Sequence, residues 1–190
     1  MHLVFNMYAL WAFGSPLERM WGTKKFLFFY FSAGLGAALI HTGVNYYHVS
    51  QGLEALAAAG VPESDVLSLL REGKYNETWM QLAPRGEVDN MLSSFMTPAV
   101  GASGAIYGIL VAFGMLFPNS ELFLIFLPVP IKAKYFIPVL IGLDLFSGVT
   151  GYSIFGNGIA HFAHIGGALF GFLMMWYWKR NQFNKNRWDS

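Results

Sequence analysis

The sequence contains no cysteine. This absence excludes a thiol nucleophile, a thiolate metal site and a disulfide framework, and it leaves the redox compartment open. Charged residues are also scarce, at 12% of the 190 positions, whereas hydrophobic residues make up 55%. Such a composition is too apolar for an ordinary soluble domain and predicts an integral membrane protein. The chain also lacks a phosphate-binding loop and a nucleic-acid-binding signature, so we expect no nucleic-acid partner.

The N-terminal segment lacks the basic residues and the small-residue cleavage site that a signal peptide carries. Residues 1–6 already belong to an apolar run. From this abrupt beginning we expect about 30 to 60 further residues upstream, enough for one more membrane helix.

Five apolar segments approach the length of about 20 residues that a membrane-spanning helix requires. They are residues 2–16, 26–44, 100–117, 135–148 and 159–178. We therefore predict an all-α polytopic membrane protein, with a single membrane domain over residues 1–190.

The distribution of charge predicts the orientation of these segments. Basic residues gather after the first, the third and the fifth segment: Arg19, Lys24, Lys25, Lys132, Lys134, Lys179, Arg180, Lys185 and Arg187. Because such residues favour the cytoplasmic side, we place these three regions and the C-terminus in the cytoplasm. The connection at about 45–96, which has seven acidic and three basic residues, is then an extracytoplasmic insertion.

Two connections between the segments have patterns of their own. In the insertion, residues 52–59 and 64–70 look like short amphipathic helices with a break at Val61-Pro62, and Ser64 is the predicted N-cap of the second. A loosely ordered surface loop is the alternative. Residues 148–158 are rich in glycine and serine, a composition suited to a mobile flap.

Two glycine pairs predict a close contact between the third and the fifth segment. Gly104 and Gly108 are four residues apart, and so are Gly167 and Gly171. Small residues at this spacing let two helix backbones approach closely in a bilayer. This contact would bring the neighbouring Ser103 and His164 to a similar depth near the outer surface.

Ser103 and His164 form a candidate functional site, because polar side chains are costly inside a bilayer. An adjacent base that takes the hydroxyl proton is what a serine needs to become a nucleophile. Tyr107 lies one turn from Ser103, where its ring could stack on the imidazole. His2 and Asn6 share one helix face and could stabilise an oxyanion.

Simpler interpretations of these side chains stay open. Ser103 could be a small packing residue and Tyr107 part of an apolar core. His2 and Asn6 could form a satisfied polar cluster.

Two further residues of the apolar segments suggest other sites. His161 and His164 have the spacing of helical metal ligands, but no carboxylate stands nearby in the sequence, so we expect no metal. Asp144 could complete a Ser-His-Asp triad. A role in satisfying backbone or hydroxyl groups near the membrane surface fits Asp144 better.

Four motifs together resemble the rhomboid family of intramembrane serine proteases. In chain order they are His2-x-x-x-Asn6, Glu18-x-x-x-Gly22, Gly101-Ala102-Ser103-Gly104 and Ala163-His164-x-x-Gly167-x-x-x-Gly171. Tyr107 stands at the family's tyrosine position. The resemblance covers nearly the whole chain.

The resemblance implies a rhomboid-like helical bundle, of which this chain supplies five of the six core transmembrane helices, the second to the sixth. It also implies a catalytic dyad without Asp144 and without a metal or cofactor. The implied roles are Ser103 and His164 as the dyad, His2 and Asn6 with the Ser103 backbone N–H as the oxyanion hole, and Gly101 and Tyr107 in substrate binding and support.

The activity implied by the resemblance is that of an intramembrane serine endopeptidase. Its partners would be membrane-protein substrates, cut within or next to their transmembrane segments in the lipid bilayer of a bacterial inner membrane. Residues 148–158 would form the gating loop. The alternative is a non-catalytic relative that binds and escorts membrane proteins.

Overall fold

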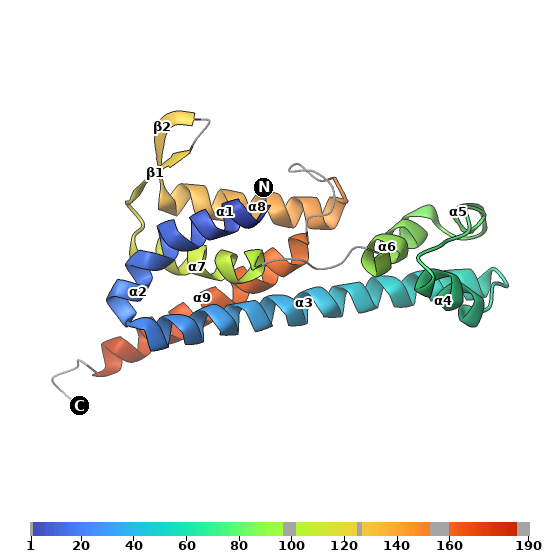
Figure 1. The fold of residues 1–190 in the computed structure, drawn as a ribbon, viewed down its shortest axis with the longest axis horizontal. Coiled ribbons are helices and arrows are strands. Elements are labelled where there is room, and N and C mark those ends of the chain that lie inside the picture. Colours follow the sequence, from blue (N-terminus) through green and yellow to red (C-terminus); the bar gives the residue numbers. More distant parts are fainter. Residues whose placement is uncertain (1, 97–101, 125–126, 153–159, 186–190) are drawn as a thin grey trace. The chain divides into compact units, whose positions relative to one another are not determined.

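The computed structural model of the chain describes residues 2–96, 102–124, 127–152 and 160–185. Helices make up almost all of this part, so the predicted all-α fold is confirmed (Figure 1). The chain divides into two compact units: Met1–Ile40 with Gly101–Ser190, and His41–Val100.

The first helical stretch contains a π-helical turn. α1 (His2–Ala9) continues into η1 (Leu10–Gly14), the π turn, and then into α2 (Ser15–Trp21). Gly22 ends this stretch with a φ of +78°, a backbone conformation that glycine adopts readily. The single predicted segment over residues 2–16 is therefore three elements in the structure.

α3 (Thr23–Ala58) is one continuous helix, and it extends well past the predicted end at residue 44. No proline stands within it, and the chain turns only at Gly60, which has a φ of +86°. The apolar run ends at residue 44, but polar residues with adequate helix propensity continue the helix. The separate helix predicted over residues 52–59 is therefore wrong, because these residues belong to α3 and the turn after it.

α7 (Ser103–Leu116) forms the centre of the first unit, between α8 (Ala133–Thr150) and α9 (His161–Lys185) (Figure 1). The buried cluster around it consists of Leu17, Phe26, Phe29, Ile106, Ile109, Leu110, Ala112, Phe113, Ala133, Ile137 and Met175. Among the described residues, α3 and α8 are long and apolar enough to cross a membrane, and α7 is a shorter apolar helix. Large apolar side chains such as Leu35, Leu39 and Val139 are exposed on these helices, as a lipid environment permits.

A short hairpin that the sequence did not predict joins α7 to α8. β1 (Glu121–Leu124) and β2 (Leu127–Lys132) are antiparallel, with Glu121 opposite Lys132. Both are edge strands of a two-stranded sheet, so the prolines of β2 need not donate to a ladder.

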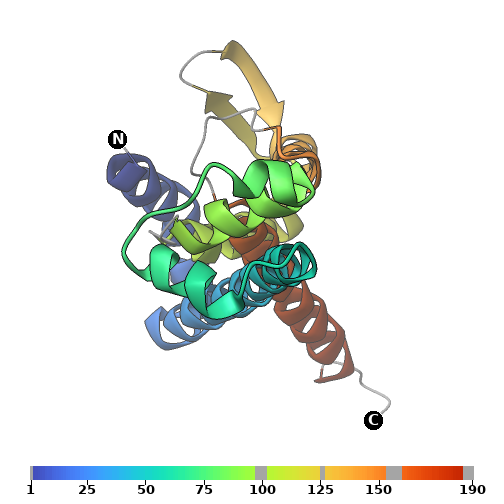
Figure 2. The ribbon, with the colours of Figure 1, turned by 90° about the vertical axis from the view of Figure 1, so that its right-hand side faces the viewer.

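The second unit has a core of its own. The end of α3 packs with α4 (Glu63–Arg71), α5 (Trp79–Leu82) and α6 (Arg85–Met96), and Figure 2 looks onto these helices. The buried side chains are Leu56, Val66, Leu70, Trp79, Val88, Met91 and Leu92. A Cβ atom at Gly52 would lie only 2.5 Å from that of Met91. The predicted insertion is thus a packed helical unit rather than a loose loop.

The start of α4 differs from the prediction in one respect. The break at Val61-Pro62 is confirmed, and Pro62 occupies the N-cap position without a side-chain cap. Ser64 lies inside the first turn of α4, so its predicted N-cap role is wrong. Proline is well suited to this end of a helix because it has no backbone N–H to leave unpaired.

Candidate active site

The contact between α7 and α9 is made by backbone atoms. A Cβ atom at Gly108 would lie 3.0 Å from the carbonyl oxygen of Gly167, and one at Gly171 would lie 2.6 Å from the Cα of Gly108. A Cβ atom at Gly167 would overlap the backbone of Gly104. No larger residue fits at this contact. The predicted packing of the two glycine pairs is confirmed.

Small residues of α3 close the other side of this contact. A Cβ atom at Gly104 would lie 2.5 Å from that of Ala37, and one at Gly108 would lie 2.5 Å from that of Ala33. Three helices therefore approach one another with almost no side chain between them.

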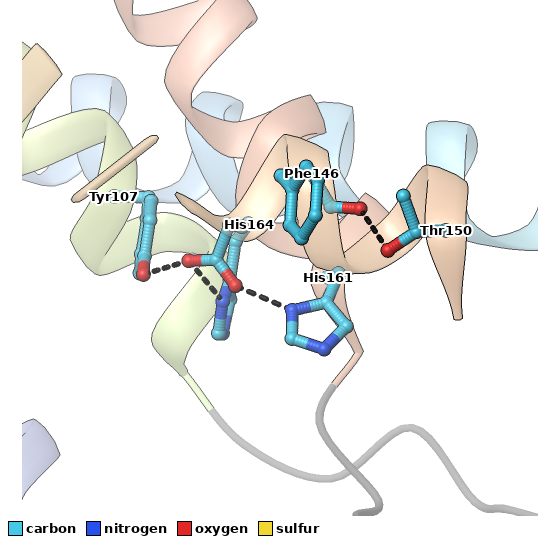
Figure 3. A network of polar contacts seen from close by, with 6 residues as sticks. Tyr107, Phe146, Thr150, His161 and His164 are labelled. Atoms are coloured by element: carbon cyan, nitrogen blue, oxygen red, sulfur yellow. Dashed lines mark hydrogen bonds and ion pairs between the residues drawn. The ribbon is translucent and has the colours of Figure 1, made fainter. Parts of the chain in front are cut away.

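The glycine contact determines where Ser103 and His164 lie. Ser103 begins α7 directly before Gly104, and a Cβ atom at Gly104 would lie 3.0 Å from the carbonyl oxygen of Ala163, which precedes His164. Tyr107, one turn after Ser103, stacks on the imidazole of His164 (Figure 3). The ring centroids are 4.2 Å apart and the planes differ by 10°. This is the stacking that the sequence predicts.

The imidazole of His164 is buried, with 8% of the residue exposed, whereas Ser103 is partly exposed. Within the described part of the chain, no hydrogen bond joins the Ser103 hydroxyl to this ring. Such bonds often tighten only when a substrate is bound. The helix contact and the Tyr107 stacking bring His164 against the first turns of α7, the helix that Ser103 begins.

The imidazole of His164 also contacts a carboxylate of α8. Asp144 of α8 is 1% exposed, and its Oδ2 accepts a hydrogen bond from the hydroxyl of Tyr107. The same oxygen lies 3.2 Å from Nδ1 of His164, and Oδ1 lies 2.5 Å from Nδ1 of His161 (Figure 3). Both oxygens have polar partners, as a buried carboxylate requires.

This network bears on two predictions. The expected role of Asp144 in satisfying a hydroxyl group is confirmed by its contact with Tyr107, and the carboxylate also contacts both histidines of α9. No carboxylate stands near His161 and His164 in the sequence, but the fold brings Asp144 beside both of them. Among the described residues, however, no group of three or more His, Cys, Asp or Glu side chains could hold a metal ion.

The remaining predicted residues belong to the N-terminal helix and to the segment before α7. Asn6 of α1 is buried, with 8% exposed, and α1 contacts α7. His2 begins α1, but its side chain lies outside the described residues. Gly101 and residues 153–158 of the predicted flap lie outside them as well.

Ser147 offers a test of packing next to this network. It lies on α8 near Asp144, is 1% exposed, and its hydroxyl has no hydrogen-bond partner in the part of the chain that the structure describes. A buried hydroxyl without a partner costs about 1–3 kcal/mol. Ser147→Ala is therefore expected to raise the midpoint of thermal unfolding by about 2–4 °C for each kcal/mol recovered, measured in detergent micelles. A lowered midpoint would contradict this expectation.

The chain is similar to known proteins along almost its whole length. The family description "Rhomboid domain" matches residues 1–181. The chain is 29% identical over 177 residues to the presenilin-associated rhomboid-like protein, mitochondrial, of Bos taurus, covering 93% of this chain and 33% of that protein. It is 27% identical over 176 residues to the mitochondrial Rhomboid protein 1 of Saccharomyces cerevisiae, covering 93% and 37%. It is 29% identical over 182 residues to the Rhomboid protease AarA of Providencia stuartii, covering 91% and 49%.

The chain thus spans between a third and a half of the length of these three relatives. No solved structure matches it.

Proposed function

The chain belongs to the rhomboid family, and from this premise we propose that it is an intramembrane serine endopeptidase with Ser103 as nucleophile and His164 as base. The family includes a relative named as a protease, from Providencia stuartii, and relatives whose names state no activity. The observation that supports an enzyme here is the glycine contact of α7 and α9, beside which the serine and the buried imidazole lie.

The proposed reaction is acyl transfer to the serine. His164 takes the proton of the Ser103 hydroxyl while Oγ attacks the scissile carbonyl carbon. The amine leaves with the proton that the imidazole returns to it, and water then hydrolyses the acyl-enzyme by the same route. The stacked ring of Tyr107 restrains the plane of the imidazole during both proton transfers.

The negative oxygen of the tetrahedral intermediate needs hydrogen-bond donors. The backbone N–H of Ser103 stands in the first turn of α7, where helix N–H groups have no intrahelical partner. We assign the other donors to the side chains of His2 and Asn6, which are four residues apart on α1. Gly101 would border the substrate.

The proposed substrates are membrane proteins, cut within or beside a transmembrane segment. Proteins of this family are integral membrane proteins, and the two long apolar helices of this chain agree with that location. We place the protein in a bacterial inner membrane, as the family resemblance suggests. On the basis of the charge pattern, residues 45–96 lie outside and the C-terminus in the cytoplasm.

A serine-directed label together with a cleavage assay tests the proposal. Wild type in lipid vesicles is expected to cut a reporter transmembrane protein and to react with a fluorophosphonate, because Ser103 is the activated nucleophile. Ser103→Ala is expected to abolish both. The matched control is Ser93→Ala, which removes an exposed serine of α6 and should retain both.

Absence of both cleavage and labelling would contradict the proposal. If wild type cuts none of several reporters and takes no label, the endopeptidase proposal fails, and binding and escort of membrane proteins becomes the function to test by co-purification from native membranes.

A further inference from the structure

The first unit contains a cavity of about 180 Å³ far from the proposed active site. Leu116, the last residue of α7, lines this cavity, whereas Ser103 begins the same helix. Residues of α2, of the start of α3 and of the last turns of α9 complete the lining, at the end of the unit where these segments come together (Figure 1). About 10–15 Å³ is enough to hold one water molecule, so this cavity has room for a larger group.

One wall of the cavity is formed by two tryptophan rings. The rings of Trp21 and Trp178 meet edge to face, with centroids 5.3 Å apart and planes at 90°. Nζ of Lys25 lies 4.2 Å from the centroid of the Trp178 ring, a favourable position for a cation. Tryptophan is enriched where a membrane meets water, so we place the cavity at the membrane surface.

A second lysine is fixed at the cavity by the end of α7. Nζ of Lys179 donates a hydrogen bond of 3.3 Å to the carbonyl oxygen of Met115, in the last turn of this helix. Such terminal carbonyl groups have no partner within their own helix. An ammonium group has three N–H donors, so this contact leaves Lys179 with donors for a further acceptor.

The charges of the two lysines are not compensated by acidic side chains. Neither Lys25 nor Lys179 forms an ion pair with any carboxylate of the described residues. α7 and α9 contain no acidic residue, and Glu18 of α2 accepts a hydrogen bond from Thr23. Two positive charges at one small cavity repel each other. A bound anion would remove this repulsion and accept hydrogen bonds from both ammonium groups.

We propose that this cavity binds the phosphate group of an anionic phospholipid, held by Lys25 and Lys179. Basic pockets between the ends of membrane helices suit such headgroups. The apolar part of the lining, which includes Leu116 and Met175, would contact the glycerol and the beginning of the acyl chains. A free phosphate ion has no use for these apolar contacts, so the lipid is the occupant that fits the whole cavity.

The surface of α9 beside the cavity agrees with a lipid ligand. Trp176 and Tyr177, in the same turn as Trp178, are 51% and 60% exposed. Large aromatic side chains at this level are typical of the boundary between headgroups and acyl chains. The proposal does not rest on the endopeptidase function, because it concerns a site at the other end of α7 and can be tested without any peptide substrate.

A purely structural role of the two lysines is the competing explanation. Lys25 would then only pack on Trp178, and Lys179 would only satisfy the end of α7. Substitution by methionine separates the two roles, because it keeps an unbranched apolar stem against the rings and removes the charge. A structural role predicts a change in stability without any change in affinity for lipid.

The experiment counts bound lipids on the intact chain by native mass spectrometry from detergent micelles. Phosphatidylglycerol and phosphatidylcholine with identical acyl chains are titrated separately. Wild type is expected to bind one phosphatidylglycerol saturably and phosphatidylcholine at least about 10-fold more weakly, because hydrogen bonds between charged groups are the strong ones. Added inorganic phosphate is expected not to displace the lipid.

The variants locate the site. Lys25→Met and Lys179→Met are each expected to weaken binding of phosphatidylglycerol by on the order of 10-fold, and the double variant is expected to lose the saturable site. The matched control is Lys24→Met, which makes the same change at an exposed lysine that does not line the cavity. This control should bind phosphatidylglycerol as wild type does.

Three results would overturn the proposal: equal binding of the two lipids, an equal loss of affinity in Lys24→Met, or displacement of the lipid by inorganic phosphate at similar concentration. If the lysine variants do not fold, Leu116→Phe decides, since it narrows the cavity and keeps both charges. Weaker binding of phosphatidylglycerol by this variant supports the site, and unchanged binding overturns it.

Discussion

His164→Ala is expected to lower kcat for reporter cleavage by on the order of 10⁴- to 10⁶-fold, and adding Ser103→Ala is expected to lower it no further. The reason is that the two residues act as one unit. Without the base the hydroxyl is not activated, and without the hydroxyl the base has no proton to take. The measurement compares wild type, the two single variants and the double variant with one reporter in lipid vesicles.

His41 supplies the control for this comparison. It is also a histidine within an apolar helix, partly buried and hydrogen-bonded to Asn45 at 3.1 Å. His41→Ala is expected to cleave at the wild-type rate because this residue is outside the proposed site. If the losses of His164→Ala and Ser103→Ala multiplied in the double variant, the two residues would act independently, and the shared mechanism would be wrong.

Gly167→Leu is expected to abolish cleavage and the cooperative thermal unfolding of the protein. The added side chain would overlap the backbone of Gly104, and backbone atoms of a packed helix cannot move aside as a flexible side chain can. α7 and α9 must then separate. A displacement of about 1 Å between reacting groups already costs on the order of 10²-fold in rate, so even a protein that folded would be nearly inactive.

Gly142→Leu is the matched control, since it makes the same change in another apolar helix. Apart from its chain neighbours and the backbone of its own helix, no atom of the described residues lies within 4 Å of a Cβ atom at Gly142 of α8, so the leucine has room. This variant is expected to fold and to cleave as wild type does. Wild-type cleavage by Gly167→Leu would show that the α7–α9 contact is not needed for activity.

The α7–α9 contact and the stacking of Tyr107 could be predicted from the sequence for a physical reason. Close approach of membrane helices depends on small residues four apart within each helix, as at Gly104 and Gly108. The position of Tyr107 relative to Ser103 depends on helical spacing alone. Both properties are local, so they can be recognised without knowing the rest of the fold.

The partners of Asp144 could not be found in this way. They lie 17, 20 and 37 residues away in the sequence, on two other helices. Which of the side chains on α7 and α9 face this carboxylate depends on the rotation and depth of α8 in the bundle. Local patterns contain no information about either quantity. An isolated carboxylate in an apolar segment marks a candidate functional residue, but it does not indicate which side chains that residue contacts.

The course of α3 and the hairpin between α7 and α8 were missed for a different reason. Hydropathy indicates where a helix can lie in lipid, not where its hydrogen bonds end, and α3 continues to Ala58 although its apolar run stops at residue 44. In β2, Pro128 and Pro130 argue against a strand. The pairing of Glu121 with Lys132 joins residues that are not neighbours in the sequence.

The π turn η1 has a consequence for how this N-terminal stretch is compared with other sequences. A π turn contains more residues than an α turn, so α1 and α2 are out of phase by about one residue although the backbone is continuous. The i, i+3 and i, i+4 spacings identify residues on one helix face within α1 and within α2, but not across Leu10–Gly14. Loss of one residue there would rewind the turn as α-helix rather than break it. When a relative with one residue fewer in this stretch is aligned with this chain, the gap therefore belongs in this turn.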